Sequence, residues 1–200
     1  MIKLFLPIVV LLLSINLFAQ SQALPDCVQD FLYSNAEAPF GKINPEAPKE
    51  LEQFGQLAGV WEMTSHAEFQ GQWFSGWPAI WTWKYALDGT NILDYYYRAK
   101  ENTPPIYPQP VDIHALNLRV YDEETNAWSI TWIANNSGEA RYTAEVKNSE
   151  IWMRPVEATS PQTRIIFSEI TDDSFKWRTE SQDENGNWTY QFYMLANRIQ

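Results

Sequence analysis

The segment WFSGWPAIWTWKY, residues 73–85, carries a run of large aromatic side chains: Trp73, Trp77, Trp81, Trp83 and Tyr85. The spacing of four residues between the first three tryptophans fits one face of a helix, but it also fits a strand, because four is twice the strand repeat. The step from Trp81 to Trp83 fits only the strand. We therefore predict a strand that is bent at residues 76–78 and carries all five aromatic side chains on one face.

The same alternation occurs on both sides of this segment. Residues 59–69 place Trp61 and Met63 opposite polar neighbours, which is typical of a half-buried strand. Further alternating segments are separated by turn residues and lie at residues 90–100, 111–121, 127–134, 139–146, 151–157, 163–170, 175–182 and 188–199. About ten antiparallel strands with short sequential connections predict an all-β, up-and-down barrel, since closure leaves no exposed strand edge. A sandwich of two sheets is the alternative.

Two of the expected strands combine an apolar face with a polar face. In residues 90–100, Tyr95 and Tyr97 lie on the face opposite Asp94 and Arg98. We expect the tyrosine face to point into the barrel, and the two charged residues to be surface partners. An inverted strand would instead make Asp94 and Arg98 a buried acid–base pair.

In residues 111–121, His114 begins an otherwise apolar face that lies opposite Asn117 and Arg119. We expect this apolar face to point inward as well, with the histidine at the rim of the barrel. In residues 127–134, Trp132 belongs to the face with Trp128 and Ile130 and is expected inside. Glu139, Glu145 and Glu180 are interpreted as exterior charges.

Residues 1–23 have the organisation of an export signal. Lys3 precedes a long apolar stretch, and small residues allow cleavage after Ala19 or Ala23. The apolar run contains proline, serine and asparagine and is shorter than the ~20 residues of a membrane-spanning helix. We therefore predict a secreted or periplasmic protein without stable membrane insertion.

The rest of the N-terminal region differs from the strands that follow it. Residues 24–48 have no clear periodicity and predict an irregular extension, whereas residues 48–57 predict one short helix ahead of the barrel domain, residues 49–200. Cys27 is the only cysteine, so no internal disulfide stabilises the fold. With 45% hydrophobic and 15% aromatic residues, the chain has enough apolar material for a core.

The net charge of −11 argues against nucleic acid as a partner, because nucleic-acid surfaces require clustered Lys and Arg. The sequence contains no nucleophile elbow, metalloprotease motif, phosphate-binding loop or dinucleotide fingerprint. Two histidines and one cysteine give no convergent metal-ligand set. We therefore assign no catalytic residue, metal site or cofactor.

Three features of the chain resemble lipocalins and the wider calycin superfamily of barrels. Gly59 and Trp61, in LAGVWE, match the Gly-x-Trp opening of the first calycin strand, and Arg198 matches the basic residue that packs across that tryptophan from the last strand. The segments at residues 87–96 and 119–138 are similar to bacterial lipocalin-like proteins of uncharacterised function. The resemblance implies a barrel with an internal cavity, closed structurally by Gly59, Trp61 and Arg198.

The resemblance covers residues 50–200, with two departures from lipocalins. The chain lacks a lipocalin-type disulfide, and about ten strands exceed the lipocalin eight. The ten-stranded barrels of fatty-acid-binding proteins and nitrobindins are more similar. No equivalent of the haem-ligating histidine of nitrobindins is recognisable, so the resemblance implies no cofactor.

A barrel wider than eight strands is expected to enclose a cavity rather than to be filled by its own side chains. The residues that we expect to bind an apolar or amphipathic small molecule there are Trp77, Trp81, Trp83, Tyr95, Tyr97, His114 and Trp132. One alternative is a barrel enzyme of the isomerase or cyclase type that uses His114 as an acid–base group. Another is a carbohydrate-binding module in which the tryptophan stripe faces outward.

Overall fold

The computed structural model describes Leu24, residues 38–104 and residues 109–200. The expected signal peptide, residues 1–23, lies outside the described residues. Most of the expected irregular extension, residues 25–37, also lies outside them. The described part of the extension, residues 38–48, contains turns and no strand or helix.

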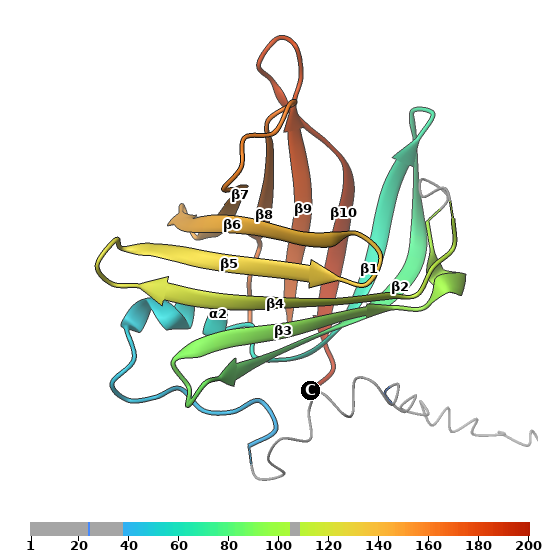
Figure 1. The fold of residues 1–200 in the computed structure, drawn as a ribbon. Coiled ribbons are helices and arrows are strands. Elements are labelled where there is room, and N and C mark those ends of the chain that lie inside the picture. Colours follow the sequence, from blue (N-terminus) through green and yellow to red (C-terminus); the bar gives the residue numbers. More distant parts are fainter. Residues whose placement is uncertain (1–23, 25–37, 105–108) are drawn as a thin grey trace, which may run out of the picture.

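Ten antiparallel strands close into one barrel, in which β3–β6 cross in front of β8–β10 and β1 (Figure 1). In chain order the strands are β1 (Gly59–Phe69), β2 (Gln72–Ala86), β3 (Asn91–Arg98), β4 (Ile113–Asp122), β5 (Ala127–Ala134), β6 (Gly138–Lys147), β7 (Glu150–Pro155), β8 (Thr163–Ser168), β9 (Ser174–Gln182) and β10 (Trp188–Arg198). Each strand pairs with its sequence neighbours, and β1 pairs with β10 to close the ring. The expected up-and-down barrel is confirmed, and the two-sheet sandwich is wrong.

A short helical segment covers one end of the barrel. It consists of η1 (Lys49–Leu51) and α2 (Glu52–Gly55), and Figure 1 shows α2 beside the end where β4 meets β5. Leu51 and Phe54 of this segment, and Leu57 just after it, are fully buried, and the Phe54 ring meets the Trp128 ring edge-on at 4.9 Å between centroids. The expected short helix is thus confirmed and acts as a plug.

One further helical turn, η2 (Lys100–Asn102), lies in the β3–β4 connection. Within the described ranges, no helix has both the length and the apolar composition that a membrane crossing requires.

Arg198 and Trp61 lie together at the plugged end. They are opposite each other in the β1–β10 ladder, and the guanidinium carbon of Arg198 lies 4.0 Å from the centre of the Trp61 ring. The guanidinium also donates to three backbone carbonyl oxygens, those of Gln56, Ala58 and Asp172. A Cβ atom at Gly59 would collide with this guanidinium, which explains the glycine there.

An irregularity in the β1–β2 ladder divides the aromatic run of β2. Ser65 pairs with Trp77 and His66 pairs with Ser75, so Gly76 (φ 118°) is left without a partner in the ladder. Such a bulge exchanges the two faces of the strand beyond it. The prediction that all five aromatic residues share one face is therefore wrong for Trp73, which lies on the outside and is 46% exposed.

The faces of β3 and β4 are also opposite to those expected. Asp94 lies opposite Trp83 in one ladder and opposite Asn117 in the next, so these residues share the inner face. The polar residues of the inner face are all buried: Asp94, Arg98, Asn117 and Arg119. The prediction that Asp94 and Arg98 are surface partners is wrong, because this barrel encloses a polar stripe rather than a uniformly apolar core.

The apolar outer face of β3 is covered by the chain itself. Tyr95 and Val60 form a buried cluster, against which Leu24, Phe40 and Tyr97 pack. Because part of the N-terminal extension shields these residues, an apolar face is stable on the outside of the barrel. Alternation alone therefore predicts where the strands lie, but it does not predict which face of each strand points into the barrel.

Candidate functional site

The barrel encloses a cavity of about 310 Å³, which extends from the turn between β5 and β6 to Arg119, a residue that contacts the helical plug. Asn136 and Ser137, in the turn between β5 and β6, line it and are themselves exposed, so the cavity reaches the surface at this turn. Arg98 and Ile113, at the ends of β3 and β4, line the same region.

Large apolar side chains from different strands form most of the cavity wall. They are Trp81 (β2), Tyr96 (β3), Trp132 (β5), Phe167 (β8), Trp177 (β9) and Phe192 (β10). The rings of Trp81 and Tyr96 meet edge-on at 5.7 Å, and those of Trp177 and Phe192 at 6.0 Å. Edge-on contact is a favoured arrangement for a pair of aromatic rings. Neighbouring wall residues therefore stabilise one another through ring contacts.

A buried polar group stands behind the aromatic wall. The Asp94 carboxylate accepts hydrogen bonds from the Trp81 indole Nε1 (2.6 Å) and from the Asn117 side-chain nitrogen (2.8 Å). It also forms an ion pair with Arg119. Asp94 and Arg119 are both fully buried, and Asn117 and Arg119 also line the cavity. Buried charges are retained only when they are paired in this way.

Arg119 connects this polar group to the helical plug. Its guanidinium carbon lies 4.2 Å from the centre of the Trp83 ring and 4.8 Å from that of Phe54. Burial lowers the pKa of Arg119 well below its ordinary value. The carboxylate of Asp94 and the two ring faces stabilise the cation against this loss of hydration.

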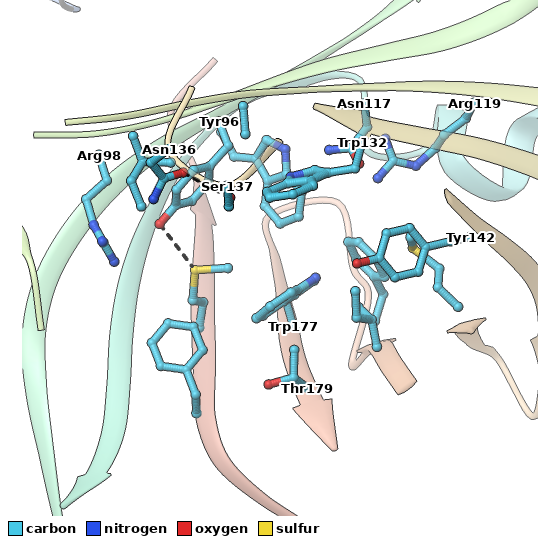
Figure 2. Close-up of a pocket in the computed structure, with 18 residues that line it drawn as sticks. Tyr96, Arg98, Asn117, Arg119, Trp132, Asn136, Ser137, Tyr142, Trp177 and Thr179 are labelled. Atoms are coloured by element: carbon cyan, nitrogen blue, oxygen red, sulfur yellow. Dashed lines mark hydrogen bonds between the residues drawn. The ribbon is translucent and has the colours of Figure 1, made fainter. Parts of the chain in front are cut away.

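Hydroxyl groups add hydrogen-bonding capacity to the wall. The Tyr96 hydroxyl donates to the Met194 sulfur at 3.7 Å, the contact drawn as a dashed line in Figure 2. Tyr142 and Thr179 also line the cavity, and burial raises the pKa of the Tyr142 phenol. Figure 2 places Arg98 and Arg119 at opposite sides of the group of lining residues. The lining therefore combines apolar rings with polar groups at both sides.

The predicted ligand-binding residues fall into three groups. Trp81 and Trp132 line the cavity. Trp83 points inward but is buried beneath the wall against Phe54 and Arg119, and Trp77 is half-buried farther along β2. Neither Trp83 nor Trp77 lines the cavity.

Tyr95, Tyr97 and His114 lie on the outer face of the barrel wall and do not line the cavity, which corrects the expectation for these three residues. The Tyr95 hydroxyl lies 2.6 Å from His114 Nδ1, and the Tyr97 and His114 rings are 5.1 Å apart. Their strands carry Tyr96 and Asn117 on the inner side. The more apolar face of β3 points outward, because Leu24 and Phe40 shield part of it from water.

Trp81 and Trp132 are the only predicted ligand-binding residues in the described cavity lining. The lining residues that the sequence analysis did not predict include Tyr96, Arg98, Asn117, Arg119 and Trp177. A signal for some of them was present. Polar residues recur two or four positions apart at 94 and 98, and again at 117 and 119, on strands adjacent in the meander. A polar stripe that continues across neighbouring strands indicates a shared interior network, because buried polar side chains need partners on the adjacent strand. Exposed polar side chains need no such partners, since water satisfies them.

Among the described residues, the cavity lining contains no histidine, cysteine or carboxylate. The same part of the chain contains no group of three or more His, Cys, Asp or Glu side chains that could hold a metal ion. The site therefore offers apolar contact, hydrogen bonds and guanidinium groups to a ligand. It offers few groups for proton transfer.

Glu180 also differs from its expectation as an exterior charge. It lies on the outer face of β9 but is buried, and it forms ion pairs with Arg164 (2.5 Å) and Arg178 (2.7 Å). The Arg164 guanidinium lies between the rings of Trp152 and Trp188, at 4.3 and 3.9 Å from their centroids. Two tryptophans outside the barrel thus pack on the guanidinium that pairs with this carboxylate.

No family model matches the chain, and no curated protein matches its sequence. The solved structures that resemble it include the crystal structure of Rv2717c from M. tuberculosis, with a TM-score of 0.47 and 10% sequence identity. The likeness covers 78% of this chain and 100% of that chain. These values are too low to transfer any property of that protein to this chain.

Proposed function

We propose that the protein binds an apolar or amphipathic small molecule inside the barrel. The observation that carries the proposal is the cavity of about 310 Å³, which is lined by seven aromatic side chains and has polar groups at its sides. Small-molecule sites have this composition, with mostly apolar walls and a few polar groups that fix orientation. The exposed Asn136 and Ser137 provide a route for the ligand from solvent.

The volume limits the size of the ligand. A water-sized group occupies about 30 Å³ in a liquid, so 310 Å³ holds on the order of ten non-hydrogen atoms. Medium-chain amphiphiles fit this space better than long-chain lipids. The guanidinium of Arg98 beside the cavity mouth favours a polar or anionic head group at that position.

We further infer that the chain is a calycin-like barrel. Support comes from the stacking of Arg198 on Trp61, from Gly59 beside it, and from the ten-stranded meander.

We also propose that residues 1–23 direct export, and that the mature chain begins at Gln20 or Leu24. The intact mass of the exported protein tests this point, and a mass that includes Met1 contradicts it.

An acid–base enzyme has less support. The histidine on which that alternative rests, His114, lies outside the barrel and is engaged with Tyr95. The described cavity lining offers arginine, amide and hydroxyl groups instead. We therefore do not propose a reaction.

The binding proposal is tested by titrating the protein with decanoic acid, 1-decanol and decylamine while tryptophan fluorescence is recorded. Trp81, Trp132 and Trp177 line the cavity, so binding should change the fluorescence saturably. Stearic acid should bind more weakly than decanoic acid because of the cavity volume. Absence of a saturable response to all four probes contradicts the proposal.

A matched pair of variants locates the site. Thr179→Leu adds bulk to the cavity wall, whereas Thr131→Leu makes the same change on the outer face of β5. The first should weaken decanoic acid binding about tenfold, which corresponds to about 1.4 kcal/mol, and the second should leave it unchanged. Equal effects of the two substitutions contradict an interior site.

A further inference from the structure

A second aromatic surface lies outside the barrel, away from the internal cavity. The outer aromatic cluster consists of His66 (β1), Trp73 (β2), Tyr190 and Tyr193 (β10). Trp73 is 46% exposed and Tyr190 is 36% exposed. The bulge at Gly76 and a register shift in β10 between Thr189 and Phe192 bring these rings to the same face. Large exposed rings grouped in this way are uncommon on a protein without a binding role there.

The four rings support one another in defined orientations. His66 stacks on Tyr193 with centroids 4.4 Å apart and an interplanar angle of 4°. Trp73 contacts Tyr193 at 5.3 Å and Tyr190 at 5.8 Å, with tilts of 52° and 53°. Trp73 is thus tilted against both tyrosines, and Trp73 and Tyr190 each remain partly exposed to solvent. Burial and the nearby Lys176 lower the pKa of His66, which favours the uncharged imidazole in this stack.

A polar groove of about 750 Å³ adjoins the outer aromatic cluster. Tyr190 belongs to both, and the Lys176 ammonium, which also lines the groove, lies 5.5 Å from the Tyr190 ring centre. Arg178 lines this groove and forms two hydrogen bonds there. It binds the Glu180 carboxylate at 2.7 Å and the Ser168 hydroxyl at 2.8 Å. The groove therefore presents fixed polar groups next to exposed rings.

The charges along the groove nearly cancel. Its described lining has three carboxylates, Glu150, Glu169 and Glu180, and two cations, Lys176 and Arg178. Arg164, outside the lining, pairs with Glu180 and supplies a third positive charge. The groove thus offers many donors and acceptors without a net charge to attract a polyanion or a polycation.

We propose that the outer aromatic cluster and the adjoining groove bind a neutral oligosaccharide. The apolar C–H face of a sugar ring packs on the electron-rich face of an aromatic ring, while its hydroxyl groups need donors and acceptors at the side. Trp73 and Tyr190 supply the ring faces, and the groove supplies the polar groups. This site is separate from the cavity and does not depend on the proposed internal ligand.

Other occupants fit less well. The chain carries a net charge of −11, which disfavours anionic glycans, nucleic acid and anionic membranes. A second copy of the chain would bring two polar grooves together and bury their paired charges, which is costly. A neutral, hydroxyl-rich ligand leaves these ion pairs in place and forms hydrogen bonds with them.

The test uses isothermal titration with three neutral hexasaccharides, cellohexaose, chitohexaose and maltohexaose, and a heparin hexasaccharide as the anionic control. At least one neutral probe should bind saturably, and the heparin probe should not. Trp73→Ala and Tyr190→Ala should each weaken that binding about tenfold, because each removes one stacking face. Trp73→Tyr, which keeps an aromatic face, should retain most of the affinity.

Phe74→Ala is the matched control, because Phe74 is 44% exposed and belongs to the same hairpin but pairs with Ala67 on the other face. It should leave hexasaccharide binding unchanged. Trp73→Ala should also leave the decanoic acid titration unchanged, which separates this site from the proposed internal one. No binding of the neutral hexasaccharides, equal effects of Trp73→Ala and Phe74→Ala, or preferred binding of the heparin probe would overturn the proposal. Self-association that disappears in Trp73→Ala, without hexasaccharide binding, would also overturn it and identify a second copy as the occupant.

Discussion

Asp94 and Arg119 form an ion pair inside the barrel, where their side chains are 0% and 1% exposed. The pair lies behind the cavity wall, and the carboxylate also accepts hydrogen bonds from Trp81 and Asn117. Three strands, β2, β3 and β4, and the plug residue Phe54 are thus connected through one buried group. This connection orients the indole of Trp81, a wall residue, so the polar interior supports the shape of the site.

Removing one partner of this pair should be strongly destabilising. Arg119→Met leaves the Asp94 carboxylate buried without its cation, and we expect a loss of about 3–5 kcal/mol in the free energy of unfolding. The double variant Asp94→Asn/Arg119→Met should lose less than the sum of the two single variants. Urea unfolding at constant slope measures these losses.

The control is an exposed pair. Arg154 and Glu145 are 45% and 51% exposed, and Arg154→Met should cost less than about 1 kcal/mol. A similar small loss for Arg119→Met would contradict the buried-pair interpretation.

The strand content and the closure were readable from the sequence, because alternation and turn residues depend on local pattern. The inward faces of β3 and β4 were not, since Tyr95 on the outside is covered by Leu24 and Phe40, which are distant in sequence. Hydrophobic alternation reports which face is shielded from water. It does not report whether the barrel lumen or the N-terminal extension provides the shield.

The residues of β2 and β5 show the same limit of prediction from alternation. Trp81 and Trp132 were predicted because they are apolar and in phase with their strands. Trp73 was misplaced because a single unpaired residue, Gly76, exchanges the strand faces, and no pattern of period two encodes a bulge. Glycine next to a run of aromatic residues is the one local indication of it.

Arg198→Ala should destabilise the protein by about 1–3 kcal/mol. The substitution removes the stacking on Trp61 and leaves carbonyl groups such as that of Ala58 without their donor. Arg198→Lys should recover only part of the loss, since an ammonium cannot reach several carbonyl oxygens in one plane. The urea midpoint measures the effect, and an unchanged midpoint at unchanged slope would contradict a closing role for Arg198.

His66 should make the folded protein less stable as the pH falls below about 6.5. Burial and Lys176 lower its pKa in the folded state, so the unfolded chain takes up a proton at a higher pH than the folded chain does. As the pH falls from the pKa of His66 in the unfolded chain to its pKa in the folded protein, the free energy of unfolding therefore decreases. Below the folded pKa, His66 causes no further change. His66→Gln should reduce the dependence of the free energy of unfolding on pH between about pH 7 and about pH 5.

An NMR titration of the His66 ring gives the folded pKa directly. Lys176→Met removes the repulsive cation and should move this pKa upward, toward its ordinary value. An unfolding profile that is equally steep with and without His66 would contradict the assignment.

Trp83 and Trp132 should respond differently to truncation, although both belong to the inner aromatic surface. Trp83 is fully buried against Phe54 and Arg119 and does not line the cavity, so Trp83→Ala should cost about 3–5 kcal/mol of stability. Trp132 is half-buried and lines the cavity. Trp132→Ala should cost less stability but weaken decanoic acid binding about tenfold, because it removes a side chain of the cavity wall that packs on the ligand.

Urea unfolding and the fluorescence titration, carried out on both variants, separate the two roles. If Trp83→Ala weakens binding more than Trp132→Ala at temperatures where both variants are folded, the ligand occupies the plugged end of the barrel and the assigned cavity is wrong.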